Sequence, residues 1–464
     1  MSQALHNTRS EPATGAAASG RALVAACAGN LVEWYDFAVY GAFATIIAAT
    51  FFPGSDPSAR LLASFAVFAT AFLVRPVGAL LFGRLGDRAG RRRVLATVIV
   101  LMALATAGIG LLPGYTTIGM LAPLLLTLLR SAQGLSVGGE SSGATAFVVE
   151  YAPEGRRGWY GAWLWSTLAL GVAGGIGVAV LLARVLPRAS LEGWGWRLAF
   201  LVTLPLGLVG LYLRLRLDET PRFRATQRAR AVVRRPLAAA VRGYRGRLLI
   251  GVALVAALAL TFNLFFFYLP SHLVTALAVP LPRALAASLA GLALVAVAAP
   301  LLGRLSDRVG RRPLLIGGTL ALLVGTLPAF LLVRGAGPLG LPLGYVLVGL
   351  PLSCLVIVPP FLAELFPTPV RSTALAITYG VGSALFGGTA PFLATLLVRG
   401  TGDPVTPAYY AVAVAAAAVV AALLTRETAF RPLDADSPTS SHVGDAALPA
   451  LGSHGLGPRA RDGR

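Results

Sequence analysis

The sequence contains Gly83-Arg-Leu-Gly-Asp-Arg-Ala-Gly-Arg-Arg-Arg-Val-Leu95, and a second copy follows as Gly303-Arg-Leu-Ser-Asp-Arg-Val-Gly-Arg-Arg-Pro-Leu-Leu315. Each copy is a short, arginine-dense stretch between two long apolar runs. Any short loop beside a membrane collects arginines, but that does not explain the repeated spacing of Gly, Asp and Arg. The repeat therefore indicates a chain built from two duplicated units.

A second motif repeats in the same order. Its members are an acid, a proline and an arginine with constant spacing: Glu150, Pro153 and Arg157, then Glu364, Pro367 and Arg371. Duplicated halves in a membrane protein are typical of transporters whose binding site lies between the halves.

The composition is that of an integral membrane protein. Hydrophobic residues make up 56% of the 464 residues and charged residues 12%, whereas a soluble protein carries about 25% charged residues. The net charge of +20 comes entirely from arginine. These arginines lie in short loops between apolar runs and not on one polar face, so we expect a lipid bilayer and no nucleic acid as partner. Cys27 and Cys354 lie inside apolar runs, so neither a disulfide, a metal site nor any other cofactor is indicated.

The apolar runs predict an all-α membrane protein with twelve transmembrane helices in two six-helix halves, since a spanning helix needs about 20 apolar residues. The predicted spans are 21–51, 61–83, 92–112, 116–142, 158–183, 194–216, 246–277, 283–303, 313–333, 338–365, 371–398 and 406–425.

This count also predicts the domain organisation. The expected parts are a disordered cytoplasmic tail (1–20), an N-terminal half (21–220), an arginine-rich cytoplasmic linker (221–245), a C-terminal half (246–426) and a disordered cytoplasmic tail (427–464). Most of the 39 arginines fall in the tails and the loops that follow even-numbered spans. This bias predicts a multi-pass inner-membrane protein with both termini in the cytoplasm.

Charges inside the predicted spans are candidates for function, because burying them in hydrocarbon is costly. The first span contains Glu33, Asp36 and Tyr40 on one helical face,. Asp36 lies 15 residues after Arg21, which places it about 22 Å along the helix, near mid-membrane. Proton coupling through Asp36 and Glu33 is one interpretation; purely structural pairing with another helix is the other.

The fourth span carries Arg130, Gln133 and Glu140 close to one face, with Arg130 again near mid-depth. We expect Arg130 and Asp36 to meet at the same depth. A carboxylate beside a fixed cation releases its proton readily, and reprotonation frees the cation. Arg130 and Glu140 are therefore further proton-coupling candidates, and a permanent buried ion pair is the alternative.

The repeated loop predicts a gate. Its acid, Asp87, either pairs with neighbouring arginines or sits at the positive N-terminus of a helix in the other half. Asp307 repeats the design, and setting membrane topology is the alternative role of the arginines. The gating candidates are Asp87, Arg88, Arg91, Arg92, Asp307, Arg308, Arg311, Glu150, Arg157, Glu364 and Arg371.

Polar residues in other spans suggest a substrate cavity lined by Tyr40, Gln133, Asn263, Tyr379 and Ser383. The aromatic cluster between Phe262 and Tyr268 is interpreted as lipid-facing or packing, and His272 as an interfacial residue. Gly and Pro residues near Ser383 predict an interrupted eleventh helix that flexes around a cavity.

At these residues the chain resembles the metabolite:proton symporter family of the major facilitator superfamily. The matching stretches are the repeated loop, Gly29-Asn-Leu-Val-Glu-Trp-Tyr-Asp-Phe37, Gln133-Gly-Leu-Ser-Val-Gly-Gly-Glu140, Asp218-Glu-Thr-Pro-Arg-Phe223, Glu364-Leu-Phe-Pro-Thr-Pro-Val-Arg371 and Phe386-Gly-Gly-Thr-Ala-Pro391. The resemblance implies alternating access and proton-driven uptake of small organic acids or zwitterions. It also implies that Arg130 stands at a position linked to proton coupling and Asp87 at the gating acid.

Two other functions compete with this reading. Proton-driven efflux uses the same fold, but the narrower motifs argue against it. A membrane enzyme needs paired histidines, a metal set or a nucleophile with its base, and the only histidine in a predicted span, His272, stands alone.

Overall fold

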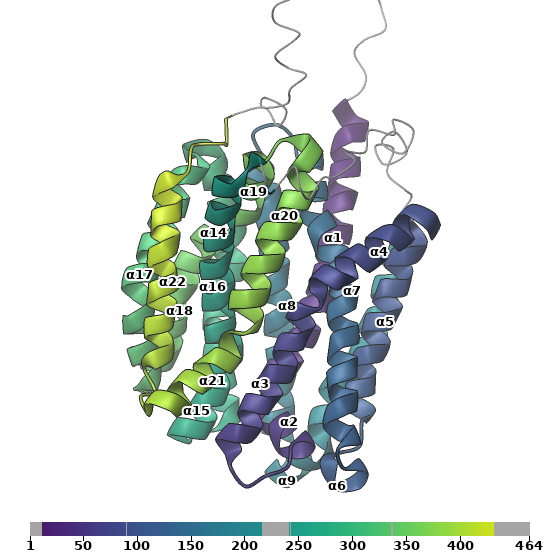
Figure 1. Cartoon of the computed structure of the whole chain (residues 1–464), viewed down its shortest axis with the longest axis vertical. Coiled ribbons are helices and arrows are strands. Elements are labelled where there is room, and N and C mark those ends of the chain that lie inside the picture. Colours follow the sequence, from purple (N-terminus) through teal and green to yellow (C-terminus); the bar gives the residue numbers. More distant parts are fainter. Residues whose placement is uncertain (1–11, 90, 216–240, 242, 336, 431–464) are drawn as a thin grey trace, which may run out of the picture.

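The computed structural model describes residues 12–89, 91–215, 241, 243–335 and 337–430. This described part consists of helices and connecting loops, without a strand. The start of α1 (Pro12–Ala42) and the end of α22 (Thr406–Leu424) lie at the same end of the bundle (Figure 1). We refer to this end as the inner end and to the opposite end as the outer end.

Six spans form the N-terminal half. They are α1 with α2 (Ala44–Phe51), α3 (Pro57–Leu73) with α4 (Arg75–Ala89), α5 (Arg91–Leu111), α7 (Leu121–Tyr151), α8 (Arg157–Val185), and α10 (Trp196–Leu201) with α11 (Thr203–Leu215). Short turns of helix, α6 (Tyr115–Ile118), α9 (Arg188–Ser190) and η1 (Leu191–Gly195), connect them.

Six spans also form the C-terminal half, three of them interrupted. They are α14 (Arg245–Asn263) with η2 (Leu264–Tyr268) and α15 (Leu269–Leu277), α16 (Leu281–Val309), α17 (Arg311–Arg334), α18 (Gly340–Leu355) with α19 (Val358–Leu365), α20 (Thr368–Gly382) with η3 (Ser383–Gly388) and α21 (Ala390–Thr401), and α22. The predicted twelve-helix architecture is confirmed.

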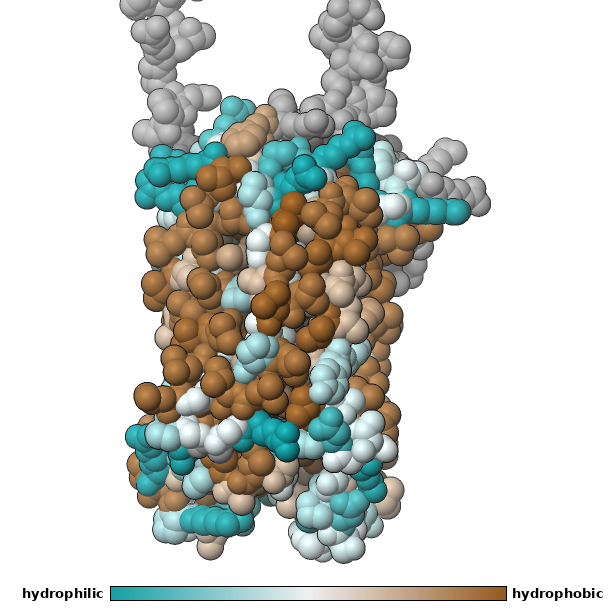
Figure 2. All heavy atoms as spheres, turned by 90° about the vertical axis from the view of Figure 1, so that its left-hand side faces the viewer, coloured by the Kyte–Doolittle hydropathy of each residue, from teal (hydrophilic) through white to brown (hydrophobic). Residues whose placement is uncertain are grey.

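Within the described residues, nine helices are long and apolar enough to cross a membrane, or ten if the bent α1–α2 pair counts as one span. Of the other two spans, α5 contributes a shorter apolar helix, Thr97–Leu111, within the residues whose side chains are described. The last span, α10 with α11, is interrupted at Val202. A belt of apolar side chains between two polar ends is visible on the surface (Figure 2), as expected for a bilayer-spanning protein.

The chain ends differ from the expected boundaries. The predicted tail at 1–20 is helical from Pro12, because the alanine-rich residues that follow are strong helix formers and proline suits a first helical turn,. At the other end, Glu427 and Thr428 contact the C-terminal half and are therefore not part of a detached tail. Residues 431–464 and most of the predicted linker lie outside the described residues.

Close helix approach within the N-terminal half depends on small residues in α7. A Cβ on Gly134 would collide with the carbonyl of Ala71 in α3, and one on Gly138 with that of Arg75 in α4. Only glycine allows this approach. It brings the polar face of α7 against the helices that carry the charges described below.

Candidate functional site

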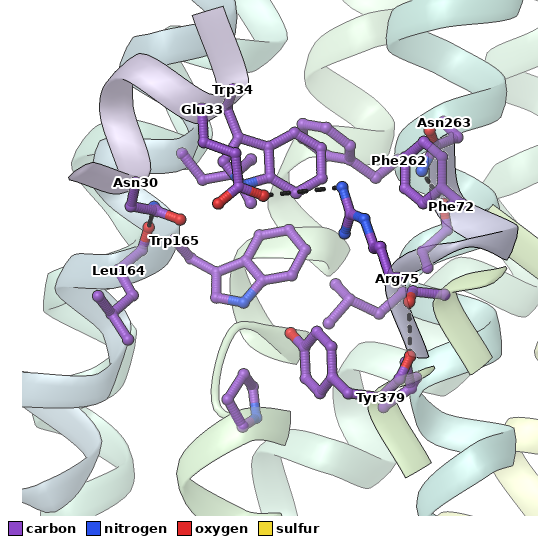
Figure 3. A pocket seen from close by; sticks show the side chains of 16 residues that line it. Asn30, Glu33, Trp34, Phe72, Arg75, Leu164, Trp165, Phe262, Asn263 and Tyr379 are labelled. Carbon is purple, nitrogen blue, oxygen red and sulfur yellow. Dashed lines mark hydrogen bonds and ion pairs between the residues drawn. The ribbon is translucent and has the colours of Figure 1, made fainter. Parts of the chain in front are cut away.

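A cavity of about 90 Å³ lies between the two halves (Figure 3). Helices α1, α3, α4 and α8 line it from the N-terminal half, and α14, α19, α20 and η3 from the C-terminal half. The lining side chains with polar or aromatic groups are Asn30, Glu33, Trp34, Phe72, Arg75, Trp165, Phe262, Asn263, Tyr379 and Ser383. We call this cavity the central pocket.

An ion pair crosses one side of the central pocket. Arg75 Nη2 lies 3.6 Å from Glu33 Oε1, and the side chains are 11% and 8% exposed. Arg75 starts α4, just after α3 ends, and Pro76 follows it. A proline inside a helix removes one backbone hydrogen bond and so favours a break at this point. The break between α3 and α4 turns the Arg75 side chain toward Glu33 of α1.

Aromatic rings surround this ion pair. The Arg75 guanidinium carbon lies 4.2 Å from the centroid of the Phe72 ring and 5.7 Å from that of Trp34. Phe262 of α14 meets Trp34 edge-on at 6.0 Å and Trp165 edge-on at 5.7 Å. Trp34, Trp165 and Phe262 thus form a corner of perpendicular rings beside Glu33, and we call it the aromatic corner.

A second buried polar network lies inside the N-terminal half, away from the central pocket. Asp36 is fully buried and accepts hydrogen bonds from the hydroxyls of Thr106 and Thr203, each at 2.8 Å. Gln133 donates to the Thr106 hydroxyl and accepts at 2.7 Å from Arg130 Nη1. Five side chains from α1, α5, α7 and α11 are therefore joined in one continuous chain of hydrogen bonds.

The expected direct meeting of Asp36 and Arg130 is replaced by this relay. Among the described contacts, the two residues are linked through Gln133 and Thr106. The Arg130 guanidinium instead lies over the rings of Tyr40, at 4.4 Å, and Phe37, at 4.7 Å. The physical reason is that the two threonine hydroxyls already occupy the carboxylate oxygens of Asp36.

The predicted cavity residues divide into two groups. Asn263, Tyr379 and Ser383 line the central pocket. Tyr40 and Gln133 do not: Tyr40 donates to the Ser64 carbonyl at 3.0 Å, and Gln133 belongs to the Asp36 network. Both are fully buried, because they face neighbouring helices of their own half.

Aromatic contacts between the halves close the pocket toward the outer end. Phe68 of α3 lies 5.4 Å from Phe267 of η2, and Phe65 lies 6.2 Å from Tyr268, measured between ring centroids. Of the two interpretations of the seventh-helix aromatic cluster, packing holds and a lipid-facing position does not, since all its members from Phe262 to Tyr268 are buried. Some of the rings pack against the other half, and Phe265 and Phe266 pack against Tyr345 of their own half.

The predicted acid of the second loop joins the halves at the inner end. Asp307, near the end of α16, accepts from the backbone N–H groups of Gly158 and Trp159 at 2.8 and 2.9 Å. These groups belong to the first turn of α8, where a helix favours negative charge. Asp307 also pairs with Arg311 at 2.9 Å. Both interactions expected from the loop motif are therefore present in this copy.

The other gating candidates of the C-terminal half surround this contact. Arg311 forms two hydrogen bonds to Glu364, at 3.0 and 3.2 Å, and Arg371 donates to the carbonyl of Ala363 at 2.7 Å. Arg308 is exposed at the inner end. In the N-terminal half Arg157 is buried.

Several predicted residues cannot be placed in the same way. The side chains of Asp87, Arg88, Arg91, Arg92, Glu140 and Glu150 lie outside the described part of the structure. His272 is buried in the C-terminal half, with Nδ1 3.1 Å from the Tyr268 hydroxyl, and does not line the central pocket.

Sequence reasoning missed Arg75, Trp34 and Trp165 in the pocket and Thr106 and Thr203 beside Asp36. A signal was available for Arg75, because it is a charge inside a predicted span. The tryptophans and threonines carry no such signal, since these residue types are ordinary in spanning helices.

A duplicated helical membrane protein with a pocket between its halves and buried charges beside it is a secondary transporter of the major facilitator type. The chain matches the family described as "Sugar (and other) transporter" over residues 21–240 and 233–437. It therefore belongs to this family, within the major facilitator superfamily.

Curated relatives are similar over nearly the whole chain. The proline/betaine transporter of Escherichia coli (strain K12) is 39% identical over 440 residues, which cover 92% of this chain and 87% of that one. The glycine betaine/proline/ectoine/pipecolic acid transporter OusA of Dickeya dadantii is 38% identical, covering 92% and 87%. The ectoine/proline transporter ProP of Corynebacterium glutamicum is 38% identical, covering 89% and 84%.

Solved structures share the fold. The proton:xylose symporter XylE bound to 6-bromo-6-deoxy-D-glucose superposes with a TM-score of 0.73, at 20% identity, covering 90% of this chain and 98% of that one. The partially occluded inward open conformation of XylE from E. coli gives 0.70, at 21% identity, covering 89% and 99%. The family match and the curated relatives show that the chain is a multi-pass membrane transporter of small solutes and not an enzyme.

Proposed function

We propose that the protein is a proton-coupled symporter that imports a small organic acid or zwitterion by alternating access. The names of its relatives support this cargo class, because proline, betaine, ectoine and pipecolic acid all pair a carboxylate with a nitrogen cation. The central pocket supports it too, since it holds one acidic and one basic side chain among aromatic rings.

The observation that carries the proposal is the network around Asp36. A fully buried carboxylate is costly unless its charge is compensated, and here two hydroxyls and a relay to Arg130 compensate it. Protonation of Asp36 removes the negative charge that this relay holds in place. Because Asp36 lies one helical turn from Glu33 on α1, a change at the network reaches the pocket through a single helix.

We infer that the N-terminal half (21–220) and the C-terminal half (246–426) rock about the central pocket. The arginine bias supports an inner-membrane orientation with both termini in the cytoplasm. A topology reporter fused after Phe430 is expected to show a cytoplasmic location for this end of the chain.

Asp36→Asn tests the proton coupling, because it mimics a permanently protonated carboxylate. In vesicles, we expect the variant to lose pH-driven uphill accumulation of radiolabelled betaine or proline. It should retain exchange of substrate across the vesicle membrane, because exchange needs no net proton movement.

Asp403→Asn, in an outer loop, is the matched control and should keep both activities. If Asp36→Asn still accumulates substrate against its gradient, another group carries the proton, and Glu33 and Glu140 are the next candidates.

A further inference from the structure

The Arg75 guanidinium has an unused edge. Its Nε and Nη2 atoms are buried and have no hydrogen-bond partner among the described residues. The nearest acid oxygen, on Glu33, is 3.6 Å from Nη2, which is beyond hydrogen-bond distance. A buried donor left without a partner costs about 1–3 kcal/mol, so this edge is poised to gain an acceptor.

Nε–H and one Nη2–H point in the same direction from the planar guanidinium. Two parallel donors at this spacing match the two oxygens of a carboxylate, which is the bidentate arrangement that arginine favours. The rings of Phe72, Phe37 and Trp34 hold the guanidinium from its sides. A carboxylate on this edge needs no rearrangement of Arg75, only the departure of Glu33.

Glu33 and the aromatic corner offer the complementary surface. Aromatic faces attract cations within about 6 Å, and alkylated ammonium groups above all. Trp34, Trp165 and Phe262 line the pocket together with Glu33. A positive nitrogen placed there gains the ring faces and the carboxylate that leaves Arg75 (Figure 3).

Charge balance then separates the two cargo classes. When a zwitterion binds, the Glu33–Arg75 ion pair is replaced by two others. The ligand carboxylate pairs with Arg75 and the ligand nitrogen with Glu33, so both side chains keep a partner of opposite charge. A simple monoanion on Arg75 displaces Glu33 from this cation and offers it no positive group in exchange, so two negative charges compete for one buried arginine. A simple cation does the reverse, since two positive charges then compete for one buried carboxylate.

We propose that the central pocket binds a zwitterion in one orientation. The carboxylate lies on the Nε/Nη2 edge of Arg75, and the alkylated nitrogen lies in the aromatic corner beside Glu33. This inference rests on the proposed transport function for the site and deepens it by choosing zwitterions over simple acids.

Ligand binding to the unmodified protein tests the proposal most directly. Calorimetry on the full chain in detergent would compare glycine betaine with two analogues that each lack one charge. In 3,3-dimethylbutyrate a tert-butyl group replaces the trimethylammonium group at nearly constant shape. Choline keeps the trimethylammonium group and lacks the carboxylate. We expect both analogues to bind at least about tenfold more weakly than glycine betaine, since about 1.4 kcal/mol gives a tenfold change.

Two variants locate the groups responsible. Arg75→Gln should weaken glycine betaine and 3,3-dimethylbutyrate far more than choline. Phe262→Leu, which keeps an apolar side chain, should weaken glycine betaine and choline more than 3,3-dimethylbutyrate. A merely structural defect would lower the affinity for all three ligands together, and thermal unfolding of each variant shows that it is folded.

Equal affinity for glycine betaine and 3,3-dimethylbutyrate would overturn the proposal in favour of a simple carboxylate pocket. The absence of glycine betaine binding to folded protein would overturn it as well. These measurements use no proton gradient. A protein that binds glycine betaine as expected but shows no pH-driven uptake would therefore refute proton coupling and leave the binding model intact.

Discussion

Four charged side chains, Glu33, Asp36, Arg75 and Arg130, lie buried where most of the surroundings are apolar. Three kinds of contact compensate them. Both arginines lie over aromatic rings, the acid of the pocket faces a cation at 3.6 Å, and Asp36 accepts from two hydroxyls. Charges in a membrane interior are retained where function needs them. The Glu33–Arg75 pair, at 3.6 Å, is the looser contact, and it is the one that a substrate can separate.

At the inner end, Glu427 provides a test at the residue scale. Its carboxylate accepts from the backbone N–H groups of Arg311 and Arg312 at the start of α17, at 2.8 and 3.0 Å. Partial burial alone would raise the pKa of Glu427, but these donors and those of the two following residues outweigh it and lower the pKa below its ordinary 4.5.

A lowered folded-state pKa means that the stabilisation is complete above the unfolded value and is lost as the pH falls through the folded value. We therefore predict that Glu427→Gln lowers the melting temperature at neutral pH. The difference from the unmodified protein should shrink below pH 4.5. Thermal unfolding in detergent from about pH 7 to pH 3 measures it.

Glu192→Gln, at an exposed outer turn, is the control for general acid effects. A Glu427→Gln difference that stays constant down to the lowest pH would show that the carboxylate charge does not stabilise α17.

At the scale of helices, the interruptions fall beside the pocket. The turn of π-helix η3 begins at Ser383, and η2 begins directly after Asn263. Both residues line the central pocket. Turns of this kind are frequent at functional sites, because the extra residue redirects side chains. The interruptions thus belong to the site as well as to the fold.

Gly388, at the end of η3, lies at a close approach of the two halves near the pocket. A Cβ there would collide with the Phe72 ring of α3. That ring cannot retreat easily, because Phe37 and Phe68 lie 5.1 and 5.4 Å away and Arg75 lies over its face. We predict that Gly388→Ala reduces the transport rate by separating the halves at an overpacking cost of about 1–3 kcal/mol.

Radiolabelled uptake in vesicles measures this effect. Gly400→Ala, in the same span, meets nothing within 4 Å and should transport normally. Equal transport by the two variants would mean that Phe72 does yield and that this contact does not limit closure.

The sequence predicted the interrupted eleventh helix, because Gly and Pro residues mark it, but not the break in the seventh. A signal for this second break was nevertheless present, because Pro270 opens α15 directly after η2, and a proline cannot continue a helix without losing a backbone hydrogen bond. A different limit applies to the site. Spacing along one helix places Glu33 and Asp36 on one face, but it cannot reveal that Arg75 faces Glu33 or that Thr106 and Gln133 link Asp36 to Arg130. Those contacts depend on how separate helices are arranged.

At the scale of the whole molecule, polar contacts hold the halves together at both ends. At the outer end, Arg399 of α21 pairs with Asp56 at 2.8 Å, and both side chains are almost half exposed. Asp56 also caps α3 by accepting from the Ser58 N–H at 2.8 Å. At the inner end, Asp307 binds the first turn of α8. Alternating access requires that these two contacts open in turn.

We predict that weakening either contact makes the pocket more accessible from the end at which that contact lies. Arg399→Gln removes the outer ion pair and leaves the Asp56 cap intact, so the outer end should open more often. An exposed pair contributes up to about 1 kcal/mol, which corresponds to a shift of roughly fivefold. Asp307→Asn removes a buried charge from the inner contact and should shift accessibility inward by a larger factor.

Labelling of a single cysteine in the pocket measures both shifts. Ser383→Cys supplies the thiol after the two native cysteines, Cys27 and Cys354, are replaced. A membrane-impermeant maleimide added outside should react faster in Arg399→Gln and more slowly in Asp307→Asn, with the reverse order from inside. The double variant should return toward the unmodified rates, since the two contacts oppose each other across one equilibrium. If both single variants change the rates in the same direction, the contacts only hold the fold together and do not set the balance between the two open states.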